Sequence, residues 1–161
     1  MSSFGISITT FVGQNYGAGK YDCVRKSAKV SLLMAMSVAI GLSAILYFTG
    51  PYIYWLFTTD KLVVEKGMEI LRIMVPTFWT YVFIEIFSGS LRGMGDSFIP
   101  MIRTSMGVCI LRVIWLFTVV PLRPEISTVI YSYPITWSVT SVLFIIYYIY
   151  YTKRQLPERI A

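Results

Sequence analysis

The sequence has no histidine, only two cysteines among its 161 residues, and charged residues make up only 14% of it. Without imidazole, histidine zinc sites, Ser-His-Asp triads and histidine proton relays are excluded. Cys23 and Cys109 are far apart, with neither metal-ligand spacing nor a disulfide framework. The composition therefore excludes most conventional enzyme chemistry, and we expect neither an enzyme nor a bound cofactor.

The sequence is unusually rich in hydrophobic residues. Hydrophobic residues make up 56% of the chain, and the mean hydropathy is +0.67. Soluble domains carry about 25% charged residues, well above the share found here. The net charge is +6, but the cations are divided among short segments between apolar runs. This pattern favours a lipid bilayer as the partner and argues against nucleic acid.

Four apolar stretches are long enough to cross a bilayer, which takes about 20 helical residues. The expected spans are about 30–52, 67–91, 97–120 and 126–151. A shorter apolar run predicts a partial N-terminal helix over 4–19, whose beginning we expect to lie before residue 1. It lacks the basic flank and cleavage site of a signal peptide. The predicted fold class is an all-α integral membrane protein, with a helical bundle over 1–152 and a tail over 153–161.

A Gly-Pro pair, aromatic residues and a charged segment separate the first predicted span from the second. Gly50-Pro51 is expected to bend or end the first helix, because proline cannot donate its hydrogen bond to the preceding turn. Aromatic residues after the proline are typical of the interfacial belt: Tyr52, Tyr54 and Trp55. The charged segment from Asp60 to Glu69 is expected to be a short external loop.

The distribution of Lys and Arg predicts the orientation. On the proposed topology the outer segments hold Lys61, Lys66, Arg72 and Arg123. The inner segments hold Lys20, Arg25, Lys26, Lys29, Arg92, Arg103, Lys153, Arg154 and Arg159. This excess obeys the positive-inside rule, so we expect a cytoplasmic C-terminus.

The stretch from Thr10 to Lys26 is polar and dense in glycine. It is not a phosphate-binding loop, because Gln14 stands where the first glycine belongs and Tyr21 where a hydroxyl should bind magnesium. It is not a dinucleotide fingerprint either, because that motif needs a βαβ unit and the neighbouring sequence is made of long apolar runs.

This stretch contains Gly-Gln-Asn-Tyr-Gly-Ala-Gly over 13–19, and a second block, Ser-Gly-Ser-Leu-Arg-Gly-Met-Gly-Asp, runs over 88–96. In this order and spacing, the two blocks resemble the C-terminal half of the multidrug and toxic compound extrusion (MATE) family. Cys23 departs from the family pattern, which commonly has Arg there. The resemblance covers essentially the whole chain and places it from the end of the eighth helix through the twelfth of a twelve-helix transporter.

The resemblance implies a secondary active antiporter in the plasma membrane that exports hydrophobic organic cations by alternating access. Sodium ions or protons would be the coupling ion. The chain would form part of the C-terminal lobe and would need the missing N-terminal lobe as its partner, so we expect no transport by the chain alone. Substrate identity and the choice between the two coupling ions stay open.

Glu85 is the first candidate for function, because a carboxylate at membrane depth is costly and usually faces a cavity, a partner or an ion path. It belongs to a polar and small-residue stripe at helical spacing: Tyr81, Glu85, Ser88, Gly89 and Arg92. We interpret Glu85 and Tyr81 as coupling or cation-binding candidates, with sodium near Glu85 as an option and no firm metal site. Some MATE members place an Asp at the position of Tyr81. The structural alternative is a packing seam in which a hydroxyl satisfies Glu85.

Arg112 is a second charge at membrane depth, in the third span. A buried guanidinium needs a carboxylate, carbonyl groups or water, and Glu85 is its candidate partner. We interpret Arg112 as structural, because a cation in a binding site would repel an organic cation.

The glycine blocks are interpreted as a cytoplasmic gate or hinge. Its members are Gln14, Asn15, Gly17, Ala18, Gly19, Arg92, Gly93, Gly95 and Asp96. The Gly-x-x-x-Gly pairs at 13 and 17 and at 89 and 93 predict close helix packing. The charges of Arg92 and Asp96 are expected either to contact the basic segment 20–29 or to be solvated.

Two other functions remain open. A lipid-linked oligosaccharide flippase of the same superfamily needs a strongly cationic cavity, which Arg112 favours, whereas Glu85 and the first glycine block argue against it. The other alternative is a non-transporting membrane fragment or interaction protein.

Overall fold

The computed structural model describes residues 2–123 and 125–156, which are almost entirely helical. Of the predicted tail over 153–161, residues 153–155 belong to the last helix and residues 157–161 lie outside the described residues. The helices are α1 (Ser2–Gly17), α2 (Tyr21–Phe57), α3 (Lys61–Met74), α4 (Phe78–Gly93), α5 (Phe98–Thr104), α6 (Leu111–Thr118) and α7 (Ile126–Gln155). A 3-10 turn, η1 (Val75–Thr77), joins α3 to α4, and a π-helix, η2 (Ser105–Ile110), joins α5 to α6.

The described helices supply four segments long and apolar enough to cross a membrane: 21–57, 61–93, 98–118 and 126–155. The second consists of α3, η1 and α4, and the third of α5, η2 and α6. These segments confirm the predicted fold class. Their large exposed apolar side chains, such as Leu33 and Met34 on α2, suit a helix surrounded by lipid or by further helices.

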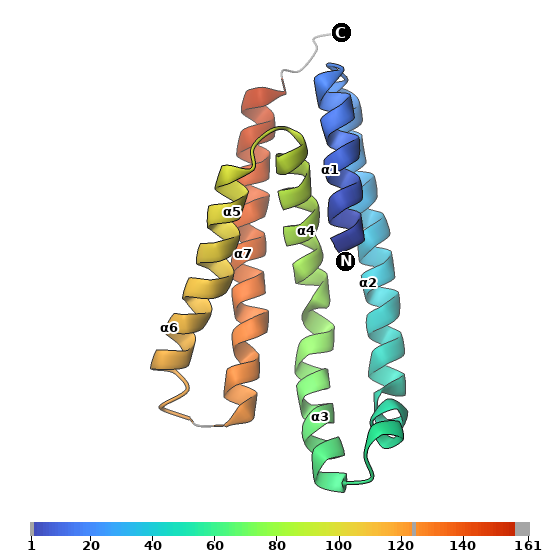
Figure 1. Cartoon of the computed structure of the whole chain (residues 1–161), viewed down its shortest axis with the longest axis vertical. Coiled ribbons are helices and arrows are strands. Elements are labelled where there is room, and N and C mark those ends of the chain that lie inside the picture. Colours follow the sequence, from blue (N-terminus) through green and yellow to red (C-terminus); the bar gives the residue numbers. More distant parts are fainter. Residues whose placement is uncertain (1, 124, 157–161) are drawn as a thin grey trace.

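The connections place both glycine blocks at one end of the bundle. In Figure 1 the α1–α2 turn, the α4–α5 turn and the end of α7 lie at the top, while the α2–α3 and α6–α7 turns lie at the bottom. α1 reaches from the middle of the bundle to the same upper end. The two glycine blocks, 13–19 and 88–96, are about 70 residues apart in sequence but therefore lie at the same end.

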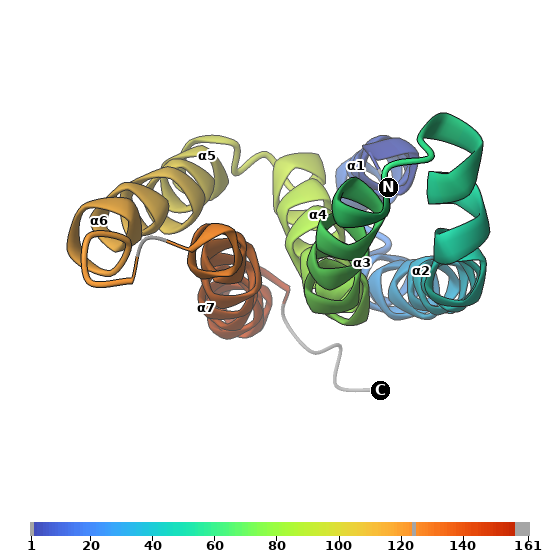
Figure 2. The same ribbon diagram turned by 90° about the horizontal axis from the view of Figure 1, so that it is seen from below.

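The first two spans are longer than the sequence predicts. α2 continues through Pro51 to Phe57, and its last turns bend away from the main axis, as Figure 2 shows. The external loop expected over 60–69 is wrong, because α3 begins at Lys61. The Asp60 side chain accepts a hydrogen bond from the Leu62 amide at 2.9 Å, so the acidic residue starts the helix instead of prolonging the loop.

The core lies between α1, α2, α4 and α7. α1 contributes Ile8 and Val12, each at most 1% exposed, and α7 contributes Phe144, which is fully buried. The facing side chains of α2 are largely small, including Ala35 and Ala39. Small residues allow the helix backbones to approach closely, which is how membrane helices gain packing energy without a hydrophobic driving force between them.

The third span packs mainly on α7, on the side away from α1 and α2 (Figure 2). The Arg103 guanidinium lies 4.0 Å from the centre of the Tyr147 ring and also donates to the Leu143 carbonyl oxygen at 3.1 Å. Near the other end, the Trp115 indole donates to the Thr128 carbonyl oxygen at 2.9 Å. Polar contacts at both ends thus attach this span to α7.

Candidate cation site

Glu85 and Tyr81 form a hydrogen-bonded pair on α4. They are one helical turn apart, and the Tyr81 hydroxyl donates to Glu85 Oε1 at 2.7 Å. Both side chains are half-buried. Glu85 precedes the end of α4 at Gly93 by eight residues, or about 12 Å along the helix axis. This depth puts a titratable carboxylate well inside the span.

The other carboxylate oxygen, Oε2, faces α1. It lies directly against Gly5, where a Cβ would collide with it. On the same face of α4, the Thr9 hydroxyl of α1 donates to the Gly89 carbonyl oxygen at 3.0 Å. The carboxylate therefore lies at a close contact between α1 and α4 that only small residues permit.

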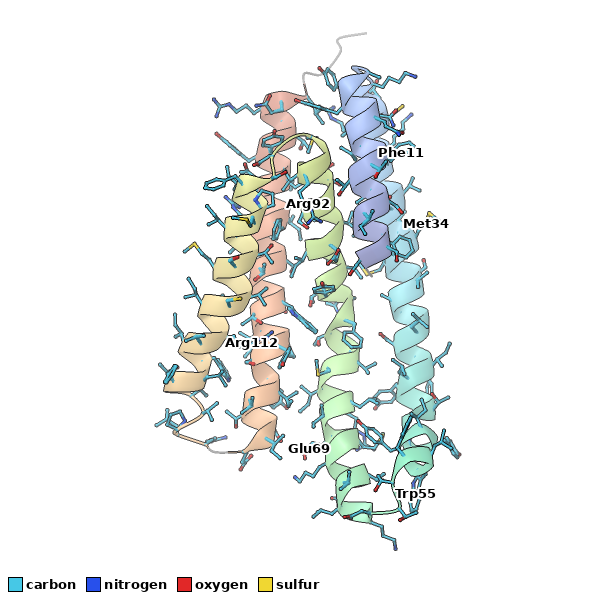
Figure 3. The ribbon with its side chains drawn as sticks, viewed as in Figure 1. Phe11, Met34, Trp55, Glu69, Arg92 and Arg112 are labelled. Atoms are coloured by element: carbon cyan, nitrogen blue, oxygen red, sulfur yellow. The ribbon has the colours of Figure 1, made fainter. Side chains whose placement is uncertain are left out.

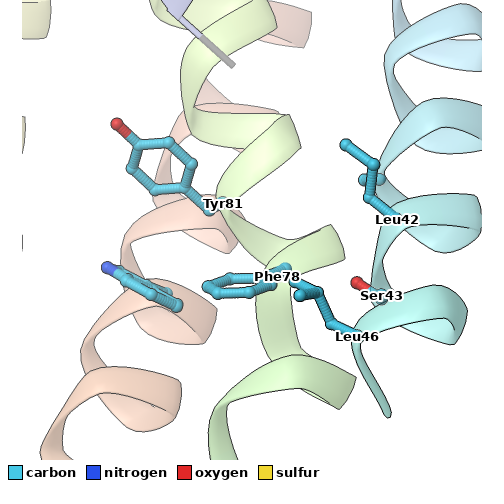
Figure 4. Close-up of a pocket in the computed structure, with 7 residues that line it drawn as sticks. Leu42, Ser43, Leu46, Phe78 and Tyr81 are labelled. Carbon is cyan, nitrogen blue, oxygen red and sulfur yellow. The ribbon is translucent and has the colours of Figure 1, made fainter. Parts of the chain in front are cut away.

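An apolar cavity of about 330 Å³ adjoins this pair. Figure 4 shows Phe78 and Tyr81 of α4 opposite Leu42, Ser43 and Leu46 of α2. The wall on the α7 side is the Trp137 indole, whose ring centre is 5.5 Å from that of Tyr81 and 6.0 Å from that of Phe78. Such a volume is at the lower end of the range for small-molecule sites, about 300 to 1,000 Å³.

Tyr81 connects the cavity to the Glu85 carboxylate. The Tyr81 ring lines the cavity, and its hydroxyl binds Glu85. Aromatic faces attract organic cations, and a nearby carboxylate supplies the compensating charge. The arrangement therefore brings together two kinds of group that attract cations.

Arg112 does not pair with Glu85, so that expectation is wrong. The Arg112 guanidinium lies over the Tyr133 ring of α7, with 3.8 Å between its central carbon and the ring centre. Its buried Nε has no hydrogen-bond partner among the described residues. In Figure 3 Arg112 lies on α6, which is separated from α4 by α7, and this separation explains why the two charges do not meet.

Both glycine blocks end their helices by the same hydrogen-bond pattern. In the first, the Lys20 amide donates to the Asn15 carbonyl oxygen at 2.8 Å, and Gly19 has a φ of 69°. In the second, the Asp96 amide donates to the Leu91 carbonyl oxygen at 3.0 Å, and Gly95 has a φ of 94°. Together with the shorter bonds from Gly19 and Gly95, these are Schellman caps, which satisfy carbonyls left free at a helix end.

The remaining members of the predicted gate take several roles. The Asn15 side chain donates to the Phe11 carbonyl oxygen at 2.9 Å, inside α1, whereas Arg92 is exposed near the end of α4 (Figure 3). Asp96 accepts the Tyr147 hydroxyl of α7 at 2.5 Å. Of the two alternatives predicted for Asp96, contact with the basic segment 20–29 or solvation, the structure shows neither alone, because Asp96 is half-buried and bonded to α7.

The two Gly-x-x-x-Gly pairs differ in their packing. A Cβ on Gly89 would lie 2.7 Å from the Gly5 carbonyl oxygen, and one on Gly93 would lie 2.6 Å from the Thr9 carbonyl oxygen. Gly13 faces the Gly93 carbonyl, but nothing lies within 4 Å of a Cβ on Gly17. The close approach is therefore between α1 and the Gly89–Gly93 face of α4.

Sequence reasoning missed Phe78 and Trp137 as cavity residues. Each is one of many aromatic residues in apolar spans, where interfacial belts and packing are the usual reasons for aromatic content. Trp137 is more than 50 residues from Tyr81 in sequence. Only the packing of α7 against α4 brings the two rings together.

The described residues therefore form a membrane-spanning helical bundle with a carboxylate inside a span and an aromatic cavity beside it. The MatE family model matches residues 1–118, and the chain belongs to this family of MATE transporters.

Individual relatives agree with this assignment. The chain is similar to human "Multidrug and toxin extrusion protein 1", with 26% identity over 66% of the chain and 19% of the relative. It is also similar to the "Probable multidrug resistance protein NorM" of Chromobacterium violaceum, with 29% identity over 62% of the chain and 22% of the relative.

The fold is also that of a solved transporter. A structure described as the inward-facing conformation of a multidrug resistance MATE family transporter superposes with a TM-score of 0.84 and 14% identity. The superposition covers 98% of this chain and 36% of that one. The chain thus spans about a fifth of the length of the two curated relatives and about a third of the solved transporter.

Proposed function

We propose that this chain forms the C-terminal part of a secondary active antiporter that exports hydrophobic organic cations in exchange for protons or sodium ions. The single observation that carries the proposal is the position of Tyr81, which lines the aromatic cavity and donates to the Glu85 carboxylate at 2.7 Å. A cation in the cavity and an ion on the carboxylate would therefore act on the same side chain.

The proposed exchange depends on the charge of the Glu85 carboxylate. Ionised Glu85 attracts a cation, and the hydrogen bond from Tyr81 holds its carboxylate beside the cavity. A proton or sodium ion on Glu85 neutralises the carboxylate and weakens its attraction for the organic cation. Because each cation lowers the affinity for the other, binding of the coupling ion from one side promotes release of the substrate there.

Either coupling ion would bind mainly through Glu85 and Tyr81. The described residues contain no cluster of three or more Asp, Glu, Cys or His side chains. A sodium ion would thus need further oxygen ligands from carbonyls, hydroxyls or water, whereas a proton needs only the carboxylate. Both ions remain within the proposal, and sodium dependence distinguishes them.

Alternating access needs a second lobe in this proposal. Carriers of this kind move one repeat against the other around a central site. We propose that the remaining lobe, supplied by a longer chain or a second polypeptide, completes the cavity, and that the end holding both glycine blocks faces the cytoplasm. The excess of Lys and Arg in the segments at that end supports the orientation.

A flippase is less well supported. Its cationic cavity would need Arg112, but that guanidinium lies on Tyr133 and does not line the cavity beside Glu85.

The test is ethidium efflux from cells that lack their own pumps. Three proteins are compared at equal membrane abundance: the chain alone, the chain joined to a matching N-terminal lobe, and that fusion with Glu85→Gln. Glu65→Gln is the matched control, because Glu65 is an exposed glutamate on α3. We expect efflux from the fusion and the control, none from the chain alone, and a loss of about tenfold or more with Glu85→Gln.

Full efflux by the Glu85→Gln fusion would overturn the role of Glu85. Efflux measured with and without sodium, at fixed pH, identifies the coupling ion.

A further inference from the structure

A second groove, of about 310 Å³, lies between α2, α4 and α7 at the end of the bundle where α2 begins and α7 ends. It contains none of the residues of the aromatic cavity. Its walls include two cations, Arg25 and Lys29, one turn apart on α2. The groove is therefore separate from the candidate cation site and opposite to it in charge.

The polarity of this groove changes with depth. α2 and α7 run in opposite directions, so Arg25 and Thr152 lie at the rim, and Leu32 and Ile145 lie deeper. Seven residues of helix separate rim from base on each wall, or about 10 Å. Phe87 of α4 adds an apolar back wall. A polar, cationic rim above an apolar base matches a molecule with an anionic head and a hydrocarbon tail.

The cations at the rim are available for a ligand. Arg25 is half-buried, and its Nη2 donates to the Leu156 carbonyl oxygen at 2.6 Å, which holds the guanidinium at the rim. Its other donors have no hydrogen-bond partner among residues 2–123 and 125–156. Lys29 is exposed. Within the described part of the chain, the one ion pair joins Lys66 to Glu69 at the opposite end, so neither cation is neutralised by a carboxylate there.

We propose that this groove binds one anionic phospholipid, with the phosphate on Arg25 and Lys29 and an acyl chain along Leu32, Ile145 and Phe87. Free phosphate would satisfy the cations but leave the apolar walls uncovered. A zwitterionic lipid would bring its own cation to a rim whose described lining residues include no carboxylate. Basic pockets between membrane helices are a known way to hold acidic headgroups. The inference goes beyond the transport proposal and does not depend on it.

The experiment measures lipid binding to the purified chain in uncharged detergent by native mass spectrometry. Phosphatidylglycerol is titrated against phosphatidylcholine with the same acyl chains, and inorganic phosphate is added as a competitor. We expect tighter binding of phosphatidylglycerol, and no displacement by phosphate at equal concentration. Arg25→Gln and Lys29→Gln should each weaken phosphatidylglycerol binding about fivefold, as expected for one cation near an acidic headgroup.

Two further variants separate a site from diffuse attraction. Lys20→Gln with Lys26→Gln removes two positive charges from the same basic segment but outside the groove, and it should leave binding unchanged. Ile149→Trp fills the groove from α7 without changing charge, and it should also weaken binding. Equal losses in the Lys20 and Lys26 control, equal binding of the two lipids, or full binding by Ile149→Trp would each overturn the proposal.

Discussion

Tyr81 takes part in both the aromatic cavity and the contact with Glu85. Its ring belongs to an aromatic wall with Phe78 and Trp137, while its hydroxyl serves the carboxylate. A hydrogen bond to a charged group contributes about 1.5 to 3 kcal/mol, so loss of the Tyr81 donor should have a measurable effect on cation binding.

We predict that Tyr81→Phe in the complete transporter weakens binding of an organic cation about tenfold and preserves the cavity wall. The reason is that the phenyl ring remains, while the carboxylate loses its hydrogen-bond donor. Equilibrium binding of radiolabelled tetraphenylphosphonium to the purified protein measures the change. Tyr131→Phe is the control, because Tyr131 is an exposed tyrosine on α7. Equal losses in both variants would show that Tyr81 has no special link to Glu85.

Arg112 illustrates how a charge at membrane depth is accommodated without an ion pair. The guanidinium covers the Tyr133 ring, and Arg103 covers Tyr147 nearer the other end of the same interface. Cation–π contacts contribute about 0.5 to 2 kcal/mol, more when both groups are desolvated. Two such contacts attach the third span to α7, so Arg112 has a structural explanation independent of the cation site.

At the scale of elements, the contact between α1 and α4 depends on glycine. The Cβ of any other residue at position 89 would approach backbone atoms of α1, which move only with the whole helix. Because Gly5 of this interface also touches Glu85, the packing of α1 sets the surroundings of the carboxylate.

We predict that Gly89→Ala lowers the free energy of unfolding by about 1 to 3 kcal/mol, the usual cost of overpacking. Gly17→Ala is the matched control, since it lies in the last turn of α1, where a Cβ meets no atom within 4 Å. It should be neutral or slightly stabilising, because alanine favours the helix more than glycine does. Denaturant unfolding of the chain in mixed micelles compares the two. A neutral Gly89→Ala would contradict the close packing of α1 on α4.

The π-helix η2 faces a comparable contact on α7. Gly107 lies against Thr140, a fully buried residue whose Oγ1 has no partner among the described residues. A Cβ on Gly107 would collide with that oxygen and lie 3.1 Å from Thr140 Cγ2. π-helices are uncommon insertions that often occur at functional sites, and here the glycine allows the widened turn to contact α7.

We predict that Gly107→Ala costs about 1 to 3 kcal/mol of stability and that Thr140→Ala restores at least half of the loss. The second change removes Thr140 Oγ1 and Cγ2, the two nearest atoms that the new Cβ would meet, and leaves only Thr140 Cβ at 3.2 Å. Unfolding measurements on the two single variants and the double variant yield the coupling between the positions. Additive effects would show that Gly107 and Thr140 do not contact each other.

The whole bundle has two distinct ends. Both glycine blocks lie at one end, and the α2–α3 and α6–α7 turns lie at the other. Cys23 lies exposed near the first end, and Cys109 lies in the middle of the third span. Cys23 can therefore report the orientation, and Cys109 serves as an internal control for a thiol within a span.

We predict that a membrane-impermeant maleimide labels Cys23 in inside-out vesicles but not in intact cells, and that Cys109 resists it in both. A cysteine placed at Thr59, in the α2–α3 turn, should show the opposite pattern to Cys23 on a Cys23→Ser background. The reagent reaches only thiols on the exposed side of the membrane, and lipid shields a thiol in mid-span. Labelling of Cys23 in intact cells would reverse the proposed orientation.

The sequence alone determined the class of this protein. The lengths of the apolar runs predict four spans, the glycine blocks predict the family, and Glu85 is conspicuous because charge is rare inside a span. These signals are local: a span needs about 20 apolar residues in succession, and a Schellman cap needs a glycine just beyond a helix end. Even so, the helical start at Lys61 was missed, because an Asp before a helix and an Asp in a loop look alike in sequence.

The tertiary structure decided which side chains meet. Arg112 lies on Tyr133 instead of reaching Glu85, Asp96 accepts Tyr147 instead of a cation, and Trp137 completes the cavity around Tyr81. The partners in the last two contacts are more than 50 residues apart. Spacing along one helix predicts which residues share its face, but the neighbour across that face depends on how the helices pack, and that packing defines the site.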